Sequence, residues 1–354
     1  TTASTSDIKS VLGDIELLRV LSMLSVVMLH IASTAWYYVE KNTIEWHIYN
    51  IMRCTCKWGV TVFVMISGTL FLHKRHISMA TLWGKYIKRI AIILVFWSFA
   101  YAIFPLLKIM VCNGNIKNWD IGGGIRAFVL GENHLWYLYM CIGLYMMIPF
   151  MEAISKDKKV LNYFIILSIA FSIVLPAFQK IPTFQEGISN QFINKFSIQM
   201  GSGYLLYFSL GYFWTLNEKI YKASGRYALY VLAFIVYLIS IYLTAKSDGK
   251  HFLVDGTMSI GNFIVTNAIF VFVINYSEKL KGCVIVWEWI NKIASFSFGI
   301  YLVHMFFVRE TTKYMVANFN NPWIVVGVTM LIVLGGSLVV CYAIKQIPFL
   351  RKIL

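Results

Sequence analysis

Two side chains that can carry a charge or a proton stand in the first long apolar segment of the chain, Arg19 and His30. An ionisable residue inside such a segment is costly, and by default it indicates a functional site. Eleven helical residues turn through ~1100°, within about 20° of three full turns, so both side chains lie on one helix face, ~16 Å apart along the axis. An alternative for Arg19 alone is an ion pair with Glu16, three residues earlier, with its charged end reaching water.

A second histidine is predicted to lie at the same depth as His30. His304 follows Trp289, where another apolar segment begins, by fifteen residues or ~22 Å of helix, and His30 follows Glu16 by fourteen residues or ~21 Å. Two imidazoles at one depth could line one cavity. A packing role, in which the His304 ring bonds to a neighbouring carbonyl, explains the residue equally well.

A third group of polar side chains precedes a further apolar segment. Glu132, His134 and Trp136 place a carboxylate, an imidazole and an indole within five residues. Together these three side chains can hydrogen-bond a polar acceptor molecule. The alternative is a turn at the membrane interface with an aromatic anchor.

Basic residues are densest between the second and third apolar segments, at Lys74, Arg75, Lys85, Lys88 and Arg89. Clustered guanidinium and ammonium groups can bind the phosphates of a nucleotide-like cofactor. The alternative, which we favour for most of them, is contact with anionic lipid that also sets the orientation of the chain. Arg89 is the strongest candidate for a cofactor ligand, because it lies deepest toward the apolar segment.

The elements that must position these residues are membrane helices. The chain has 354 residues, 59% of them hydrophobic and 13% charged, whereas a soluble domain carries about 25% charge. The net charge of +15 does not indicate a nucleic-acid partner, because the basic residues are spread between apolar runs. A membrane span needs about 20 apolar residues. Ten segments qualify: Ile15–Tyr37, Trp58–Leu72, Ile90–Met110, His134–Ile154, Val160–Phe178, Ser197–Leu216, Tyr227–Ala245, Met258–Tyr276, Trp289–Val308 and Trp323–Ile344. The second is short and can extend back to Arg53.

The predicted fold is therefore all-α, with about ten transmembrane helices in one bundle. Lys and Arg are more numerous in the loops on the side of the amino terminus, so both termini are expected to be cytoplasmic. Residues 1–14 would form a cytoplasmic segment, 15–345 the membrane domain and 346–354 a cytoplasmic tail. Cys54 and Cys56 form a pair, but no second Cys or His pair stands at zinc spacing, so no metal is expected.

Five landmarks, in order, resemble one family. They are Leu18-Arg19 through His30-Ile31, Phe63 to Phe71 with Ser67-Gly68, Lys85 to Ile90, His134 to Leu138, and Ser297 to His304. Together they are similar to the acyltransferase-3 family of integral membrane proteins, closest to the branch that O-acetylates surface polysaccharides. The resemblance runs from about Ile15 to the tenth segment.

The resemblance implies an enzyme of the bacterial cytoplasmic (inner) membrane. It would move an acetyl group from cytoplasmic acetyl-CoA to a hydroxyl of a cell-surface glycan or glycolipid. His30 would be the general base, kept neutral by burial, with covalent acyl-imidazole formation as a second mechanism. Ser67-Gly68 would serve helix packing. The implied ligands of the CoA phosphates are Arg19, Arg75, Lys85, Lys88 and Arg89, and the implied acceptor contacts are Glu132, His134, Trp136 and His304.

A transporter or exporter is the competing class. Arg19, His30 and His304 would then line a path for a polar solute or a glycan. Some relatives of the family carry an amino-acid racemase domain. If this chain belongs to such a fusion, the acceptor or cargo would be an amino acid such as serine.

Overall fold

The computed structural model describes residues 5–74, 76–113, 121–181, 203–216, 223–281, 283–348 and 350–354, and all regular structure in these ranges is helical. Seven of the described helices are long and apolar enough to cross a membrane, or eight if a bent pair counts as one span. The chain is therefore a multi-pass α-helical membrane protein, although the predicted number of ten spans is not confirmed. The spans are Ile15–Tyr38, Ile44–Leu72, Met79–Met110, Lys158–Gln179, Ser224–Lys246, Ile260–Ser277, Pro322–Gln346 and the pair Gly122–Met146 with Ile148–Ser155, bent by 54°.

Several predicted segments differ from the structure: the third span begins at Met79 instead of Ile90, and the fourth begins at Gly122 instead of His134. The second begins earlier than predicted, because α2 (Ile44–Cys56) runs into α3 (Gly59–Leu72), and the Thr43 hydroxyl caps α2 by accepting a bond from the Trp46 amide. Only the end of the sixth, α13 (Tyr204–Leu216), falls within the described residues. The ninth is divided into α16 (Val284–Ala294), α17 (Ser297–Val303) and α18 (Met305–Asn318), with His304 at the second break.

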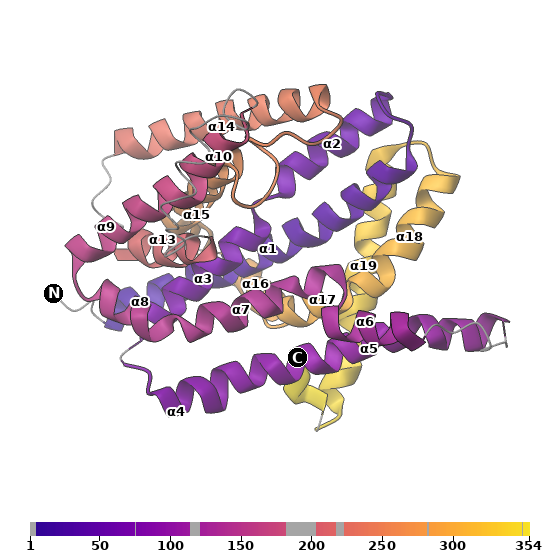
Figure 1. The fold of residues 1–354 in the computed structure, drawn as a ribbon, viewed down its shortest axis with the longest axis horizontal. Helices are drawn as coiled ribbons and strands as arrows, with labels where there is room; N and C mark the ends of the chain where they lie inside the picture. The colour runs from indigo at the N-terminus through magenta and orange to yellow at the C-terminus, as the bar shows by residue number, and fades with distance from the viewer. Residues whose placement is uncertain are drawn as a thin grey trace. The chain divides into compact units, whose positions relative to one another are not determined.

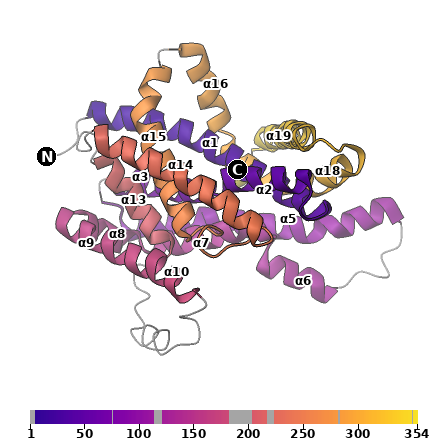
Figure 2. The same cartoon turned by 90° about the horizontal axis from the view of Figure 1, so that it is seen from above.

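The chain divides into two compact units, the first formed by Thr1–His73 and Ala153–Leu338. Within it, α1 (Thr5–Tyr38) is central and packs against α2, α3, α15 (Ile260–Lys281), α16, α17 and α18 (Figure 1). Figure 2 shows α18 beside α19 (Pro322–Gln346), whose valines join the α1 and α2 side chains in the core. Among the described residues, this unit also contains α9 (Lys158–Ile169), a π-helical turn at Ala170–Val174, α10 (Leu175–Gln179) and α14 (Ala223–Lys246).

The two ends of α1 have different neighbours in this unit. The Trp36 end of α1 meets the start of α2 and the loop that joins α14 to α15. An ion pair of 3.1 Å between Lys41 and Asp248 links these two connections, and Asn50 on α2 donates to the Thr244 hydroxyl near the end of α14 at 2.9 Å. Arg19 lies nearer the middle of this helix, about 25 Å from Trp36 at 1.5 Å per residue.

The predicted packing role of Ser67-Gly68 is confirmed at the crossing of α3 and α13. A β-carbon at Gly68 would collide with the main chain of Phe208, and one at Gly211 would collide with the main chain of Met65. Each glycine faces the main chain of the other helix. Backbones can approach this closely only where both helices present small residues.

Substitution at this crossing is expected to destabilise the protein. Gly68→Leu places a side chain where only backbone fits, and overpacking of this kind costs about 1–3 kcal/mol or more. Thermal unfolding in detergent should show a lower midpoint and a larger aggregated fraction. Gly327→Ala on α19 is the matched control, since a β-carbon there meets no atom within 4 Å. Equal stability of the two variants would contradict the proposed crossing.

The second unit comprises Lys74–Glu152 and Val339–Leu354. A π-helical turn at Leu82–Ile87 leads into α5 (Lys88–Asn113), which lies beside α6 (Ile121–Leu130) in Figure 2. α4 (Met79–Thr81) precedes that turn, and α7 (Trp136–Met146) and α8 (Ile148–Ser155) follow α6. The last turn of the chain, Leu350–Ile353, packs on α5, where the Trp97 indole donates to the Ile353 carbonyl at 3.1 Å.

Candidate active site

The imidazole of His30, on α1, packs against the imidazole of His304 in the first unit. The rings of His30 and His304 have centroids 5.2 Å apart and are tilted by 46°. His304 is fully buried, and it lies at the break between α17 and α18, which pack on α1. The structure thus brings together the two histidines that helical spacing places at one depth.

The hydrogen bond of His304 defines which of its nitrogens can accept a proton. Its Nδ1 lies 2.7 Å from the carbonyl oxygen of Tyr301. A carbonyl can only accept, so Nδ1 carries the hydrogen, and in the neutral ring Nε2 is the basic atom. The bond to a neighbouring carbonyl is the one that the packing interpretation anticipates. It also fixes the tautomer and the orientation of the ring that faces His30.

Arg19 pairs with Glu16, as the alternative interpretation of its sequence position holds. Its Nη1 lies 2.8 Å from Glu16 Oε1, and both side chains are about one-third exposed, at 34% and 27%. Arg19 and His30 share a face of α1 with a separation of ~16 Å. The remaining guanidinium hydrogens of Arg19 can still bind an anionic ligand, because the guanidinium has five donors.

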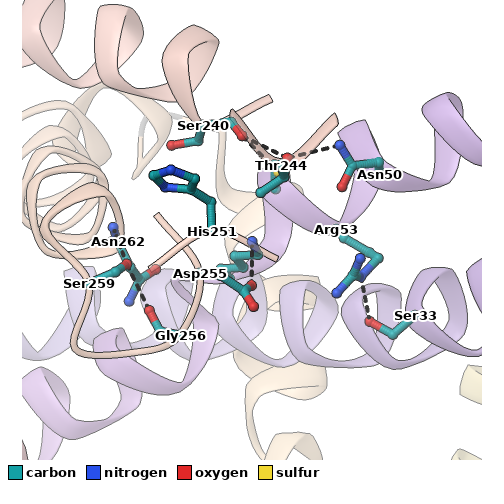
Figure 3. A network of polar contacts seen from close by, with 12 residues as sticks. Ser33, Asn50, Arg53, Ser240, Thr244, His251, Asp255, Gly256, Ser259 and Asn262 are labelled. Atoms are coloured by element: carbon teal, nitrogen blue, oxygen red, sulfur yellow. Dashed lines mark hydrogen bonds and ion pairs between the residues drawn. The ribbon is translucent and has the colours of Figure 1, made fainter. Parts of the chain in front are cut away.

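Arg53 on α2 is a buried cation to which the sequence assigned no function, although it marks the earliest start predicted for the second span. Arg53 is 8% exposed. Its Nε donates to the Ser33 hydroxyl at 3.3 Å (Figure 3), and its guanidinium carbon lies 4.3 Å from the centroid of the Trp36 ring. Ser33 follows His30 by one helical turn, so this charge lies close to the histidine pair. The signal available in the sequence was the spacing Trp46, Tyr49, Asn50, Arg53, which is one face of a helix.

Polar side chains continue from Arg53 along α2 toward α14 and α15. Lys57, which follows α2, forms an ion pair of 2.8 Å with Asp255, and the Lys57 side chain is 12% exposed. Figure 3 shows Asn50 and Thr244 bonded to each other, and Asp255 and Asn262 on the loop and helix opposite. Asn262 in turn donates to the Thr257 carbonyl at 3.1 Å. The part of the bundle around α2 therefore has a polar interior.

The predicted phosphate ligands, apart from Arg19, fall in the second unit. Lys85, Lys88 and Arg89 are exposed around the start of α5. Arg89 donates to the main-chain oxygen of Leu354 at 2.8 Å, and the Lys85 ammonium lies 5.8 Å from the centroid of the Tyr86 ring. Arg75 lies outside the described residues. These contacts leave Lys85 and Lys88 open to solvent or to a ligand.

The predicted acceptor-binding residues of the second unit do not form one compact binding site. His134 is buried, at 2% exposure, and packs edge-on against Tyr101 with 4.9 Å between ring centroids. Trp136 is 40% exposed. Glu132 precedes the short 3₁₀ turn Asn133–Leu135 and is only partly exposed. The buried imidazole and the exposed indole resemble the interfacial anchor more than a shared binding site.

Comparison with family models identifies the class of protein. Residues 12–342 match the model described as an acyltransferase domain, that of the acyltransferase-3 family. The chain belongs to the acyltransferase-3 family. The match contains Arg19, His30, Arg53 and His304, and the family implies acyltransferase activity. The comparisons with curated proteins and with solved structures gave no match.

Proposed function

We propose that this member of the acyltransferase-3 family is an O-acetyltransferase that moves an acetyl group from cytoplasmic acetyl-CoA to a hydroxyl of a cell-surface glycan. The observation that carries the proposal is the histidine pair on α1 and at the α17–α18 break, inside an apolar bundle of the acyltransferase class. The proposed location is a bacterial cytoplasmic membrane, with both termini on the cytoplasmic side.

The proposed chemistry requires one base beside the acceptor hydroxyl. His30 takes the hydroxyl proton while the hydroxyl oxygen attacks the thioester carbonyl of acetyl-CoA. The tetrahedral intermediate collapses, the carbon–sulfur bond breaks, and the departing CoA thiolate receives the proton from the imidazolium. His304, whose Nδ1 hydrogen is held by the Tyr301 carbonyl, packs against the His30 ring and positions it.

The proposed binding site for acetyl-CoA starts at Arg19 on α1. Arg19 binds a phosphate group of CoA, and the pantetheine arm follows the shared face of α1 for the ~16 Å to His30. The phosphate-binding role of Arg75, Lys85, Lys88 and Arg89 and the acceptor-binding role of Glu132, His134 and Trp136 stay predictions from the sequence. In the first unit, His304 is proposed to contact the acceptor as well as to position the His30 ring.

The deciding experiment uses the full chain, purified and reconstituted in lipid nanodiscs, with radiolabelled acetyl-CoA and a panel of bacterial glycans. Transfer of label to a glycan supports the proposal. A transporter is the second candidate, because intramembrane Arg and His residues also line solute paths. Solute flux in proteoliposomes, with no hydrolysis, acyl-enzyme or transfer, would establish the transporter and overturn the enzyme.

Arg19 and Glu16 can be separated by mutation. Arg19→Ala is expected to raise KM for acetyl-CoA about tenfold or more, because a charge-assisted hydrogen bond to phosphate is lost. Glu16→Gln is expected to change KM by less than about threefold, since an exposed ion pair contributes little. If both variants raise KM equally, Arg19 acts only through its ion pair, and the phosphate role is wrong.

A further inference from the structure

The connection between α14 and α15, residues 247–259, is an irregular segment that enters the helix bundle of the first unit. Figure 1 shows it, in orange, running back beside α2 from the end of α14 to α15. A β-carbon on Gly261, in the first turn of α15, would lie 3.1 Å from the Ser240 hydroxyl oxygen. Ser240 precedes the end of α14 by six residues, so α15 begins ~9 Å deeper than α14 ends. Residues 247–259 therefore form a re-entrant segment.

The backbone of the re-entrant segment is hydrogen-bonded within the protein, as non-helical chain at membrane depth must be. The Asp255 amide donates to the His251 carbonyl at 2.7 Å. Gly256, at a φ of +94°, makes the turn that follows Asp255, a left-handed conformation that glycine adopts without steric cost. The next carbonyl, that of Thr257, accepts from the Tyr207 hydroxyl on α13 at 2.7 Å. The deepest turn of the segment is thus bonded to the surrounding helices.

An ion pair fixes this turn well inside the membrane spans. Lys57 Nζ lies 2.8 Å from Asp255 Oδ1, and the two side chains are 12% and 28% exposed. Figure 3 shows Asp255 with this contact, beside Gly256. Lys57 stands near the middle of the second span, and the Cys56 carbonyl before it accepts from Ser25, near the middle of the first span, at 2.8 Å. Charges at such depth are costly and by default functional.

The re-entrant segment covers the depth at which the histidine pair lies. At its outer end, the Gly249 backbone approaches the Trp36 ring so closely that a β-carbon would collide with it. Trp36 follows His30 by six residues, or ~9 Å along α1. At the inner end, the ion pair lies at the level of Ser25, which precedes His30 by five residues, or ~7.5 Å. The segment therefore extends past His30 in both directions along the axis of α1.

Two ion pairs fasten the re-entrant segment, and they differ in strength. The outer pair, Lys41 with Asp248, is 61% and 66% exposed, and exposed pairs contribute little to stability. The inner pair, Lys57 with Asp255, is mostly buried. Removal of one partner from a buried pair is strongly destabilising, because the other charge is left unpaired in an apolar surrounding. The inner pair is therefore the contact that holds the segment in the bundle.

We propose that the re-entrant segment is a lid at the depth of the histidine pair, and that the Lys57–Asp255 ion pair is its latch. The inference rests on the proposed function. The closed lid keeps water of the outer side away from the acetyl thioester, which water would otherwise cleave to acetate and CoA. Opening of the ion pair admits the hydroxyl-bearing acceptor, as lid segments of enzymes do for their substrates.

The first test measures hydrolysis of labelled acetyl-CoA to acetate by the full chain in nanodiscs, without a glycan. Lys57→Met and Asp255→Asn each leave one charge unpaired, so we expect hydrolysis at least about tenfold faster than in wild type. Lys41→Met, which breaks the exposed pair of the same segment, is the matched control and should hydrolyse as wild type does. Exchange of the charges, Lys57→Glu with Asp255→Lys, should return the rate toward wild type. Equal rates in all variants overturn the lid.

The second test needs no activity and measures thiol labelling in nanodiscs. Val254, which precedes Asp255 and is 4% exposed, is replaced by cysteine in a Cys283→Ser protein, because Cys283 is an exposed free cysteine. A membrane-impermeant maleimide should label Val254→Cys at least about tenfold faster when Lys57→Met is added. Tyr37→Cys, at a position 68% exposed, should label at one rate with and without Lys57→Met.

The two tests together separate the possible failures. Unchanged labelling of Val254→Cys overturns the latch, and Asp255→Asn replaces Lys57→Met in this test if Lys57→Met fails to fold. Faster labelling with unchanged hydrolysis overturns the exclusion of water by the segment. Faster labelling with no turnover of acetyl-CoA in any protein, wild type included, would support the latch and reject the proposed function alone.

Discussion

His30→Ala is expected to lower kcat for acetyl transfer by about 10²–10⁴-fold, the usual contribution of a positioned general base. The variant should still fold, because the His30 ring is only partly buried and alanine adds no bulk. KM for acetyl-CoA should stay within a small factor, since Arg19, the proposed phosphate ligand on α1, lies ~16 Å from His30. Single-turnover transfer of labelled acetate, with unfolding midpoints measured in parallel, checks both statements.

The control for this prediction is His76→Ala. His76 is 76% exposed and pairs with Glu152 in the second unit, so its loss removes an imidazole without touching the histidine pair. Full transfer activity in a folded His30→Ala protein would reject His30 as the base. Label that remains on the wild-type protein after denaturation, and is absent from His30→Ala, would instead identify the acyl-imidazole mechanism.

Helical spacing predicted which residues of one helix share a face. Arg19 and His30 share a face of α1 because eleven residues come close to three turns, and Gly68 marks a close crossing because only glycine leaves room for a second backbone. The depth estimate for His304 also led to the correct neighbour, although its helix is broken. The helices on both sides of the break, α17 and α18, pack on α1.

Interactions between distant segments were not predictable in the same way. Arg53 was given no function because Ile44–Cys56 carries Glu45, Asn50 and Arg53, which lower its hydropathy, and the helix is stabilised by packing on α1 and by the Thr43 cap. The close approach of the Gly249 backbone to the Trp36 ring joins segments more than two hundred residues apart in the sequence. The separation of His134 from Trp136, one buried and one exposed, depends on a short 3₁₀ turn that no periodicity indicates.

The role of His304 can be decided by an isosteric substitution. The side-chain amide nitrogen of asparagine occupies nearly the position of imidazole Nδ1, so His304→Asn keeps a donor for the Tyr301 carbonyl but removes the atom at Nε2. We expect His304→Asn to fold normally and to lose about 10²-fold in kcat, because positioning of the base is lost with the ring. His304→Gln, which places its amide near Nε2 and loses the Nδ1 bond, should regain part of this activity while lowering the unfolding midpoint.

The two substitutions give opposite patterns under the two interpretations of this residue. If His304 serves only to bond the Tyr301 carbonyl at the helix break, His304→Asn keeps both stability and activity, and His304→Gln loses both. If its ring positions His30, activity follows the group at Nε2 and stability follows the group at Nδ1. Transfer rates and unfolding midpoints of the two variants therefore separate a packing histidine from a member of the active site. His304 Nδ1 lies 2.7 Å from the carbonyl oxygen of Tyr301, and the His304 ring lies against His30. We therefore expect activity to follow the group at Nε2 and stability to follow the group at Nδ1.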